Sequence, residues 1–361
     1  MVSPHLEVDL GKIKSNTKKV VELCHAQKIK VLGVTKGFSA MPQIVKALLG
    51  GGVDGLADAR MENIIDLRNF GFTDPTTLLR IPRLSNVSNV VQYADTSVNS
   101  EIAVVSALAQ AAKTMKKQHQ IILMVDVGDL REGIMTENAL ATAAQIINME
   151  GVKLIGIGTN MGCFGGVLPD VNNLSLLTEL GMAIENTLGC KLEVISGGGT
   201  SSLKQVESSS IPQGINQLRI GEGILLGTDT TNNRKIPWLH QDAFVLRAEV
   251  IEVKDKPSVP IGTIGRDAFG NVPQFVDAGI RKRAIVALGK QDVYVEGIIP
   301  LADHMIILGA SSDHLIVDIS DAQQAVQVGD NIEFALTYSG LLSVSTSRYV
   351  SKLFKGGDEN Y

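Results

Sequence analysis

Apolar residues along this chain fall into short runs separated by segments with helical periodicity. Residues 31–34 form a β-branched and apolar run, which predicts a buried strand after an amphipathic helix over 11–27. Chain long enough for a helical crossover follows each run, and parallel strands need such crossovers. The pattern predicts a (β/α)8 barrel, with a doubly wound open sheet as the alternative. The other expected strands lie near 53–57, 77–81, 95–98, 121–125, 154–158, 192–195 and 217–220.

The pattern of apolar and polar residues changes near residue 230. The polar segment TDTTNNRKIP ends at a proline, and strands with period-two alternation follow at 243–253 and 314–320. Helical periodicity nearly vanishes in this part of the chain. We therefore expect a barrel over residues 1–230 and a smaller, mainly antiparallel β domain over 231–361.

Polar residues that are unusual in a core follow directly after the predicted strands. In a barrel the carboxyl ends of all strands meet on one face, and active sites lie on that face. This placement favours the barrel over the open sheet. The residues are Lys36, Asp58, Arg80, Asn99, Arg131, Asn160, the GGGT stretch and Gly221.

Lys36 lies at the end of the first barrel strand, just before a glycine. Burial would lower the pKa of its amine and free the lone pair to form a Schiff base with an aldehyde. The alternative is a strand-end lysine whose amine reaches solvent. The rest of the chain decides between these interpretations.

Two glycine-rich stretches follow the seventh and eighth strands, ISGGGTSSL at 195–203 and RIGEG at 219–223. Barrels commonly bind phosphate after these two strands, where glycines admit close backbone approach. Each stretch alone is also typical of a tight turn. Together with Lys36 they predict a phosphorylated aldehyde cofactor, for which pyridoxal phosphate is the natural candidate.

Composition excludes several classes of protein. The chain has 361 residues and a net charge of −5, and no long basic run, so nucleic acid and anionic membrane are not expected partners. No segment has the apolar length of a signal core or a membrane span, which predicts a cytoplasmic protein. Three scattered cysteines are typical of reduced thiols, and no Cys/His spacing predicts a metal site.

Several motifs resemble those of the alanine racemase family, pyridoxal-phosphate enzymes of fold type III with a barrel followed by a β domain. VTKG resembles the cofactor-lysine motif, and RIGEGILLG resembles the eighth-strand motif. GASSDHLIVDIS at 309–320 and the segment at 334–354 resemble family stretches near the C-terminus. GTNMGCFGG at 158–166 and GTIGRDAFG at 262–270 are similar to a subgroup of ornithine or alanine racemases.

The resemblance implies roles for individual residues. Lys36 would hold the cofactor and remove the α-proton on one face. Arg219 would donate to the pyridine nitrogen, and because a guanidinium keeps its proton, that nitrogen would stay unprotonated. Arg131 would lie near the cofactor phenol and the substrate carboxylate, unless it only pairs with Glu132 or Asp129. Asn160 would lie over the ring or be a structural loop residue. The candidate phosphate ligands are Ser196, Gly198, Gly199, Thr200, Gly221, Glu222 and Tyr338.

The chain departs from the family at the second acid/base. Racemisation needs a proton donor on the opposite face, and the family uses a tyrosine in a Tyr-Gly-Arg motif of the partner subunit. Here the stretch begins at Ile264. Substitutes for the tyrosine are Cys163, Asp267, Asp313 and His314, each of which also has an ordinary structural explanation.

The resemblance therefore implies a pyridoxal-phosphate-dependent racemase that acts on ornithine or alanine. It would be a homodimer whose β domain completes the partner's active site. A related decarboxylase is one alternative, which Arg219 disfavours because such enzymes generally have a glutamate there. A non-catalytic pyridoxal-phosphate carrier is another, although such carriers lack a substantial β domain.

Overall fold

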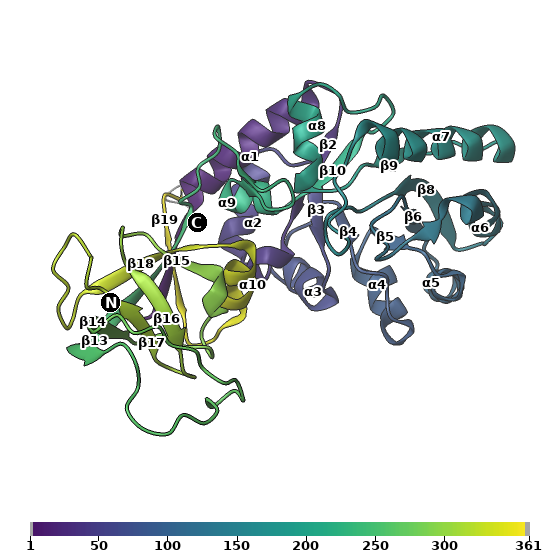
Figure 1. Ribbon diagram of the computed structural model, residues 1–361. Coiled ribbons are helices and arrows are strands. Elements are labelled where there is room, and N and C mark those ends of the chain that lie inside the picture. Colours follow the sequence, from purple (N-terminus) through teal and green to yellow (C-terminus); the bar gives the residue numbers. More distant parts are fainter. Residues whose placement is uncertain (1–2, 358–361) are drawn as a thin grey trace. The chain divides into compact units, whose positions relative to one another are not determined.

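The structure is a computed structural model that describes residues 3–357, and it divides into two compact units (Figure 1). The barrel unit consists of residues 10–241. The β unit combines the described residues 3–9 with 242–357.

Parallel strands close into a ring in the barrel unit, because β10 pairs with β2 and β5 pairs with β6. β7 (Ile134–Met135) is attached to β6 outside the ring. The predicted barrel is confirmed, and all its strands lie within a few residues of their expected positions. The ring strands are β2 (Lys30–Val34), β3 (Gly55–Asp58), β4 (Thr76–Leu78), β5 (Thr96–Asn99), β6 (His119–Asp126), β8 (Val152–Gly158), β9 (Val194–Ser196) and β10 (Gln217–Ile220).

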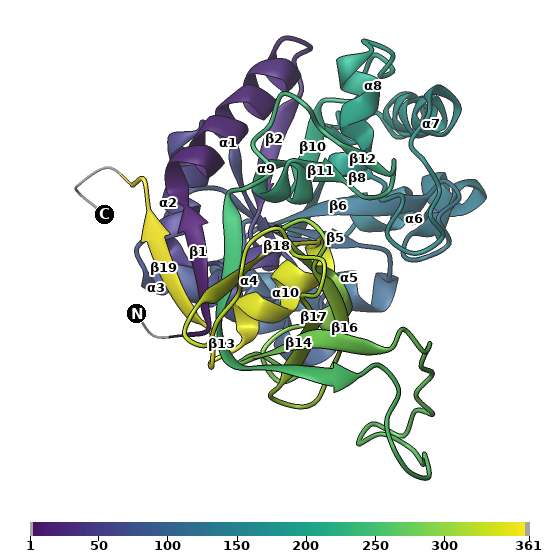
Figure 2. The same ribbon diagram turned by 60° about the vertical axis from the view of Figure 1, so that its left-hand side comes forward.

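Helices cover the outside of the ring (Figures 1 and 2). Among residues 3–357, no helix is long and apolar enough to cross a membrane. The helices of this unit are α1 (Leu10–His25), α2 (Pro42–Gly50), α3 (Met61–Asn69), α4 (Val87–Tyr93), α5 (Ile102–Thr114), α6 (Ala139–Ile147), α7 (Val171–Leu188), α8 (Leu203–Glu207) and α9 (Glu222–Leu226).

β6 shows how the sequence builds both layers of the core. Ile121, Leu123 and Val125 belong to the large apolar cluster that includes residues of the surrounding helices. Ile122 and Met124 belong to a separate small cluster with residues of β5 and β8. Alternate residues of a strand point to opposite faces, so the apolar centre of this strand fills both the ring and the layer outside it.

One glycine shows how closely the ring strands pack. A Cβ atom on Gly156 of β8 would lie 2.1 Å from the carbonyl oxygen of Val194 in β9. Only a residue without a side chain fits at this separation.

The β unit is a mainly antiparallel sheet with the order β15-β18-β13-β14-β17-β16, and β1 pairs with both β13 and β19. The predicted β domain is confirmed, but helix α10 (Tyr338–Thr346) was not expected. The strands are β1 (His5–Asp9), β13 (Phe244–Pro257), β14 (Ile280–Val286), β15 (Ile298–Pro300), β16 (Ile306–Ala310), β17 (Leu315–Asp318), β18 (Asn331–Leu336) and β19 (Ser351–Lys355).

The units divide at different residues from those expected. The sequence places 1–230 in the barrel and 231–361 in the β domain, whereas the described residues 3–9 group with the β unit. The reason is that β1 pairs antiparallel with β13 and parallel with β19. Residues 231–241 stay with the barrel because the hairpin of β11 (Thr228–Asp229) and β12 (Arg234–Lys235) begins before residue 230.

Candidate functional site

The carboxyl end of β2 positions Lys36 at one end of the barrel. Thr35 is fully buried, and the half-buried Lys36 opens the 3-10 turn η1 (Lys36–Phe38). Directly after this turn, Ser39 and Ala40 have φ values of 52° and 49°. The chain therefore reverses tightly after Lys36, and the amine leaves from a short, fixed turn rather than from a mobile loop.

A pocket of about 370 Å³ lies at the carboxyl ends of the ring strands, and Lys36 is part of its wall. The structure brings together four residues that the sequence predicted for the site: Lys36, Arg131, Asn160 and Arg219. Such a volume suits a small-molecule ligand. The full lining is Lys36, Ala59, Leu79, Arg80, Ile81, Val98, Met124, Arg131, Glu132, Asn160 and Arg219.

Arg219 in β10 is buried, with 7% of its surface exposed. Its Nη1 donates to the Ser196 hydroxyl, and its Nη2 donates to the Thr159 carbonyl at 2.5 Å. Burial is the main cause that lowers the pKa of Arg219 to about 10; Arg131 acts in the same direction, whereas Glu132 and Cys163 oppose the shift. The guanidinium therefore stays cationic at neutral pH and keeps further N–H donors for a ligand.

Arg131 enters the pocket from the loop after β6. Its Nε and Nη2 donate to the two carboxylate oxygens of Glu132, and this pairing raises the pKa of Arg131. With the Asn160 amide oriented so that its oxygen faces the guanidinium, that oxygen accepts from Nη2 and from Nη1, the latter at 3.3 Å. Both explanations of Arg131 thus apply, because the residue is paired with Glu132 and also lines the pocket.

The glycine-rich exits of β9 and β10 lie against each other. Gly198 has a φ of 103°, which side-chain-bearing residues rarely adopt. Thr200 begins the 3-10 turn η4 (Thr200–Ser202), and its hydroxyl accepts from the Gly223 N–H at 3.1 Å. The predicted phosphate residues Gly198, Gly199, Thr200 and Gly221 therefore come from two joined loops.

The side chain of Glu222 is hydrogen-bonded to Thr228 and Thr230 rather than to the glycine-rich loops. Its Oε1 accepts from the Thr228 hydroxyl at 2.7 Å and from the Thr230 N–H at 3.0 Å. Burial raises the pKa of Glu222. This residue can contribute to an anion site only through its backbone N–H at the start of α9.

Cys163 lies in the loop after β8, which Asp129 organises. The buried carboxylate of Asp129 accepts from the N–H groups of Gly162, Phe164 and Val167 at 3.0–3.2 Å. The Cys163 thiol is exposed and interacts with Arg131. The structure therefore holds Cys163 beside a residue of the pocket wall.

Four predicted residues belong to the β unit. Asp267 caps a turn by accepting from the N–H groups of Phe269 and Asn271 at 2.9 and 2.8 Å. Asp313 pairs with the adjacent His314 at 2.9 Å. Tyr338 is the first residue of α10. The roles of these residues at the pocket stay predictions.

Comparison with known proteins identifies the family. The profile of the alanine racemase N-terminal domain matches residues 8–228. A lysine racemase of Thermotoga maritima is 43% identical over 98% of this chain and 99% of its own length, and an ornithine racemase of Acetoanaerobium sticklandii is 42% identical over 97% and 99%. The chain belongs to the alanine racemase family.

An alanine racemase structure from Clostridium difficile 630 shares the fold, with a TM-score of 0.75 and 18% identity over 98% of this chain and 96% of that one. The identities to full-length racemases also establish the enzyme class. This member of the alanine racemase family is an amino acid racemase, as the motifs predicted.

Carboxylates that surround the predicted residues of the racemase were not evident from its sequence. Glu132 was considered only as an ion-pair partner, yet it lines the pocket. Asp58 was noted only for its place after a strand, yet it is fully buried and hydrogen-bonded to Thr35. Asp129 was considered only as another ion-pair partner of Arg131. A carboxylate at the end of a buried strand was the available signal for Asp58.

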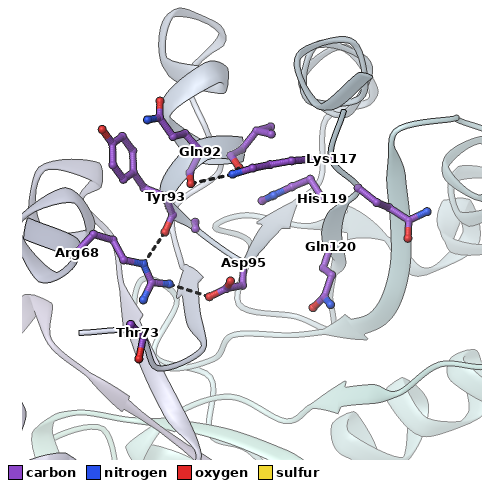
Figure 3. Close-up of a pocket in the computed structure, with 11 residues that line it drawn as sticks. Arg68, Thr73, Gln92, Tyr93, Asp95, Lys117, His119 and Gln120 are labelled. Carbon is purple, nitrogen blue, oxygen red and sulfur yellow. Dashed lines mark hydrogen bonds and ion pairs between the residues drawn. The ribbon is translucent and has the colours of Figure 1, made fainter. Parts of the chain in front are cut away.

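A second pocket, of about 470 Å³, lies at the opposite, amino ends of β5 and β6 (Figure 3). The cationic side chains of Arg68 and Lys117 in this pocket already have hydrogen-bond partners within the protein. Arg68 donates to Asp95 at 2.8 Å and to the Tyr93 carbonyl, and Lys117 donates to two carbonyl oxygens of α4. Barrel enzymes bind substrate at the other face, so we assign this pocket to the stability of the racemase.

Proposed function

We propose that this racemase uses pyridoxal phosphate and interconverts the enantiomers of a basic amino acid, ornithine or lysine. The carrying observation is that Lys36 and the buried Arg219 line one pocket at the carboxyl ends of the ring strands. The substrate class rests on the lysine and ornithine racemases that match nearly the whole chain. Alanine, the other substrate suggested by the motifs, has support from the fold and from alanine racemases that match less than half of this chain.

The residues of the pocket fit a pyridoxal group. Lys36 supplies an amine from a fixed turn, and Arg219 has donors left over after its bonds to Ser196 and Thr159. The Thr159 hydroxyl is buried and has no partner among the described residues. A buried hydroxyl without a partner is rare in proteins, so this group supports the presence of a polar ligand nearby.

Bound pyridoxal phosphate withdraws electrons from the α-carbon of an amino acid and so makes the α-proton acidic. In our proposal Lys36 removes or returns that proton on one face. Arg219 keeps its own proton and donates to the ring nitrogen without protonating it. Arg131, held by Glu132, would receive the substrate carboxylate, and Asn160 would contact the ring. In these roles each side chain binds, orients or moves a proton.

The phosphate would be held where the exits of β9 and β10 meet. Two observations support this placement: the positive φ of Gly198, and the hydrogen bond from the Gly223 N–H to the Thr200 hydroxyl that joins the two loops. We assign Ser196, Gly199, Gly221 and the N–H of Glu222 to the same cup, and the phosphate role of Tyr338 stays a prediction.

We further propose a homodimer in which the β unit of one subunit reaches the pocket of the other. The loop over residues 258–279 extends from β13 and β14 (Figure 2) and exposes large apolar side chains. Ile261 is 92% exposed and Val276 is 86% exposed. Large apolar side chains exposed on a projecting loop support an interface with another subunit. Asp267 and Ile264 belong to this loop. A cytoplasmic location, consistent with three free cysteines, stays a prediction.

The deciding experiment follows α-proton exchange and chirality together. The cofactor-loaded protein is incubated in deuterated water with separate L-ornithine, L-lysine, L-alanine and L-serine. We expect deuterium uptake and appearance of the D-enantiomer with ornithine or lysine, and far less with alanine or serine. Lys36→Ala is the matched control, and it should lose both signals and the visible absorbance of the bound cofactor.

Three other outcomes would each contradict a different part of the proposal. Exchange only with alanine would overturn the substrate assignment. A visible cofactor spectrum with no exchange for any amino acid would favour the non-catalytic carrier. A spectrum that survives Lys36→Ala would remove Lys36 from its assigned role.

A further inference from the structure

Asp58 joins the ends of two neighbouring ring strands. It is the last residue of β3 and has no solvent exposure. Its Oδ2 accepts from the Thr35 hydroxyl at the end of β2 at 2.5 Å and from the Asn63 amide in α3 at 3.0 Å. Its Oδ1 accepts from the Arg60 N–H at 2.7 Å. One buried carboxylate thus connects the turn before α3 with the turn that carries Lys36.

Thr35 is fixed through all of its polar groups. Its N–H donates to the Ala57 carbonyl at 2.9 Å, and its carbonyl accepts from the N–H groups of Phe38 and Ala40 at 3.2 Å each. Only the hydroxyl bond to Asp58 reaches beyond the backbone of the two strands and the turn. Since Lys36 is the next residue, the orientation of Thr35 sets the direction in which the Lys36 side chain leaves the strand.

A buried carboxylate is costly to maintain in a barrel interior. Burial raises the pKa of Asp58, while the bonds from Thr35, Arg60 and Asn63 and the charge of Lys36 act in the opposite direction. The bonds to Arg60 and Asn63 serve the start of α3. The hydrogen bond from Thr35 does not cap a helix, and it holds the residue that directly precedes Lys36.

We propose that Asp58 is a positioning residue for Lys36, because it holds the Thr35 hydroxyl and thereby fixes the turn from which Lys36 enters the pocket. The inference rests on the proposed function insofar as Lys36 is the lysine that binds pyridoxal phosphate. It concerns a contact to Lys36 through Thr35, and Asp58 itself need not touch substrate or cofactor.

The test uses the full-length chain, freed of cofactor with hydroxylamine and then reloaded with pyridoxal phosphate. The rate of reloading is followed by the visible absorbance, and the free energy of unfolding is measured separately in urea. Thr35→Val removes the hydroxyl at constant shape, and Asp58→Asn replaces one acceptor oxygen with a donor. Misplacing the amine should slow reloading about 10-fold or more in each variant.

The chain offers two matched controls. Asn63→Ala removes the other bond to the same carboxylate oxygen, so it should lower stability and leave the reloading rate unchanged. Thr35→Ser restores a hydroxyl and should recover most of the wild-type rate. Because both changes break one shared bond, the double variant Thr35→Val, Asp58→Asn should reload no more slowly than the slower single variant.

The outcomes separate this inference from the proposed function. A reloading rate in Thr35→Val equal to that of the wild type would overturn the positioning role while leaving Lys36 in place. Equal slowing by Asn63→Ala and Thr35→Val would show that Asp58 acts on stability alone, and it would overturn the role as well. Absence of any visible cofactor signal in the wild type would instead contradict the proposed function itself.

Discussion

The carboxylate of Glu132 binds the guanidinium of Arg131, its neighbour in the chain, through two nitrogens at once. Asn160 approaches the same guanidinium with its amide oxygen. Two-point pairing of this kind fixes the plane of the guanidinium as well as its position. Arg131 therefore presents a fixed face to the pocket, which a substrate carboxylate can meet without reordering the side chain.

Replacing Glu132 with Gln tests this arrangement. The change keeps the volume but removes the charge that pairs with Arg131, so the guanidinium should become mobile. We expect kcat/KM to fall about 10-fold, which corresponds to roughly 1.4 kcal/mol, mainly through a higher KM. Glu137→Gln, an exposed change in the next segment, is the matched control. Unchanged kinetics in Glu132→Gln would exclude a role for the pair in binding.

Arg219→Glu tests the assigned donor to the ring nitrogen. A buried carboxylic acid can give up a proton to that nitrogen, whereas Arg219, with a pKa of about 10, does not do so at neutral pH. We expect racemisation to slow by about 10²-fold or more and a slow release of keto acid to become measurable by coupled dehydrogenase assay. Arg219→Lys keeps the cation and should release none. Full racemase activity without keto acid in Arg219→Glu would refute the assignment.

Gly198→Ala tests the phosphate cup. A Cβ atom at Gly198 would lie 2.9 Å from the Ser202 hydroxyl oxygen, and the backbone has a φ of 103°. We expect weaker pyridoxal phosphate binding, by about 10-fold, measured by absorbance titration. Gly189→Ala is a matched control, because Gly189 also has a positive φ, 62°, but ends α7 with open space around it. It should lose about 1 kcal/mol of stability and bind the cofactor normally.

The barrel could be predicted from the sequence because short strand-like segments recur at a spacing that suits helical crossovers, several of them with a polar residue at the end. Lys36 and Arg219 were predictable for the same reason, since each belongs to a short motif attached to such a segment. The contacts of Asp58 and Asp129 were not, because they depend on which N–H and O–H groups the fold brings to each carboxylate. Strand β1 was assigned to the wrong unit for a similar reason: the partners β13 and β19 that hold it lie more than two hundred residues away.

The second acid/base can be located by the asymmetry of proton exchange. Loss of the group opposite Lys36 should abolish α-deuteration of one enantiomer while exchange of the other persists. We expect this result for one of Cys163→Ala, Asp267→Asn, Asp313→Asn or His314→Gln, measured by NMR with each enantiomer separately. Cys190→Ala, a partly buried cysteine of the barrel unit, is the control for Cys163. Symmetric activity in all four variants would exclude every candidate.

His119, in the second pocket (Figure 3), should make the free energy of unfolding depend on pH. It is buried, its Nε2 lies 2.8 Å from the Ser97 hydroxyl oxygen, and burial lowers its pKa from an ordinary 6.5 to about 4. Folding therefore favours the neutral ring. Its contribution is fully present above pH 6.5 and is lost as the pH falls through about 4, because the unfolded chain takes up the proton first.

We expect the wild type to lose about 2–3 kcal/mol of unfolding free energy from this residue between pH 6.5 and 4, measured by urea titration at several pH values. His119→Gln keeps a polar group near Ser97 but cannot be protonated, so its stability should fall less steeply across this range. If His119→Gln keeps the wild-type slope, then His119 is not a source of acid sensitivity, and carboxylates whose pKa is lowered by folding, such as Glu7 and Asp318, must be tested in its place.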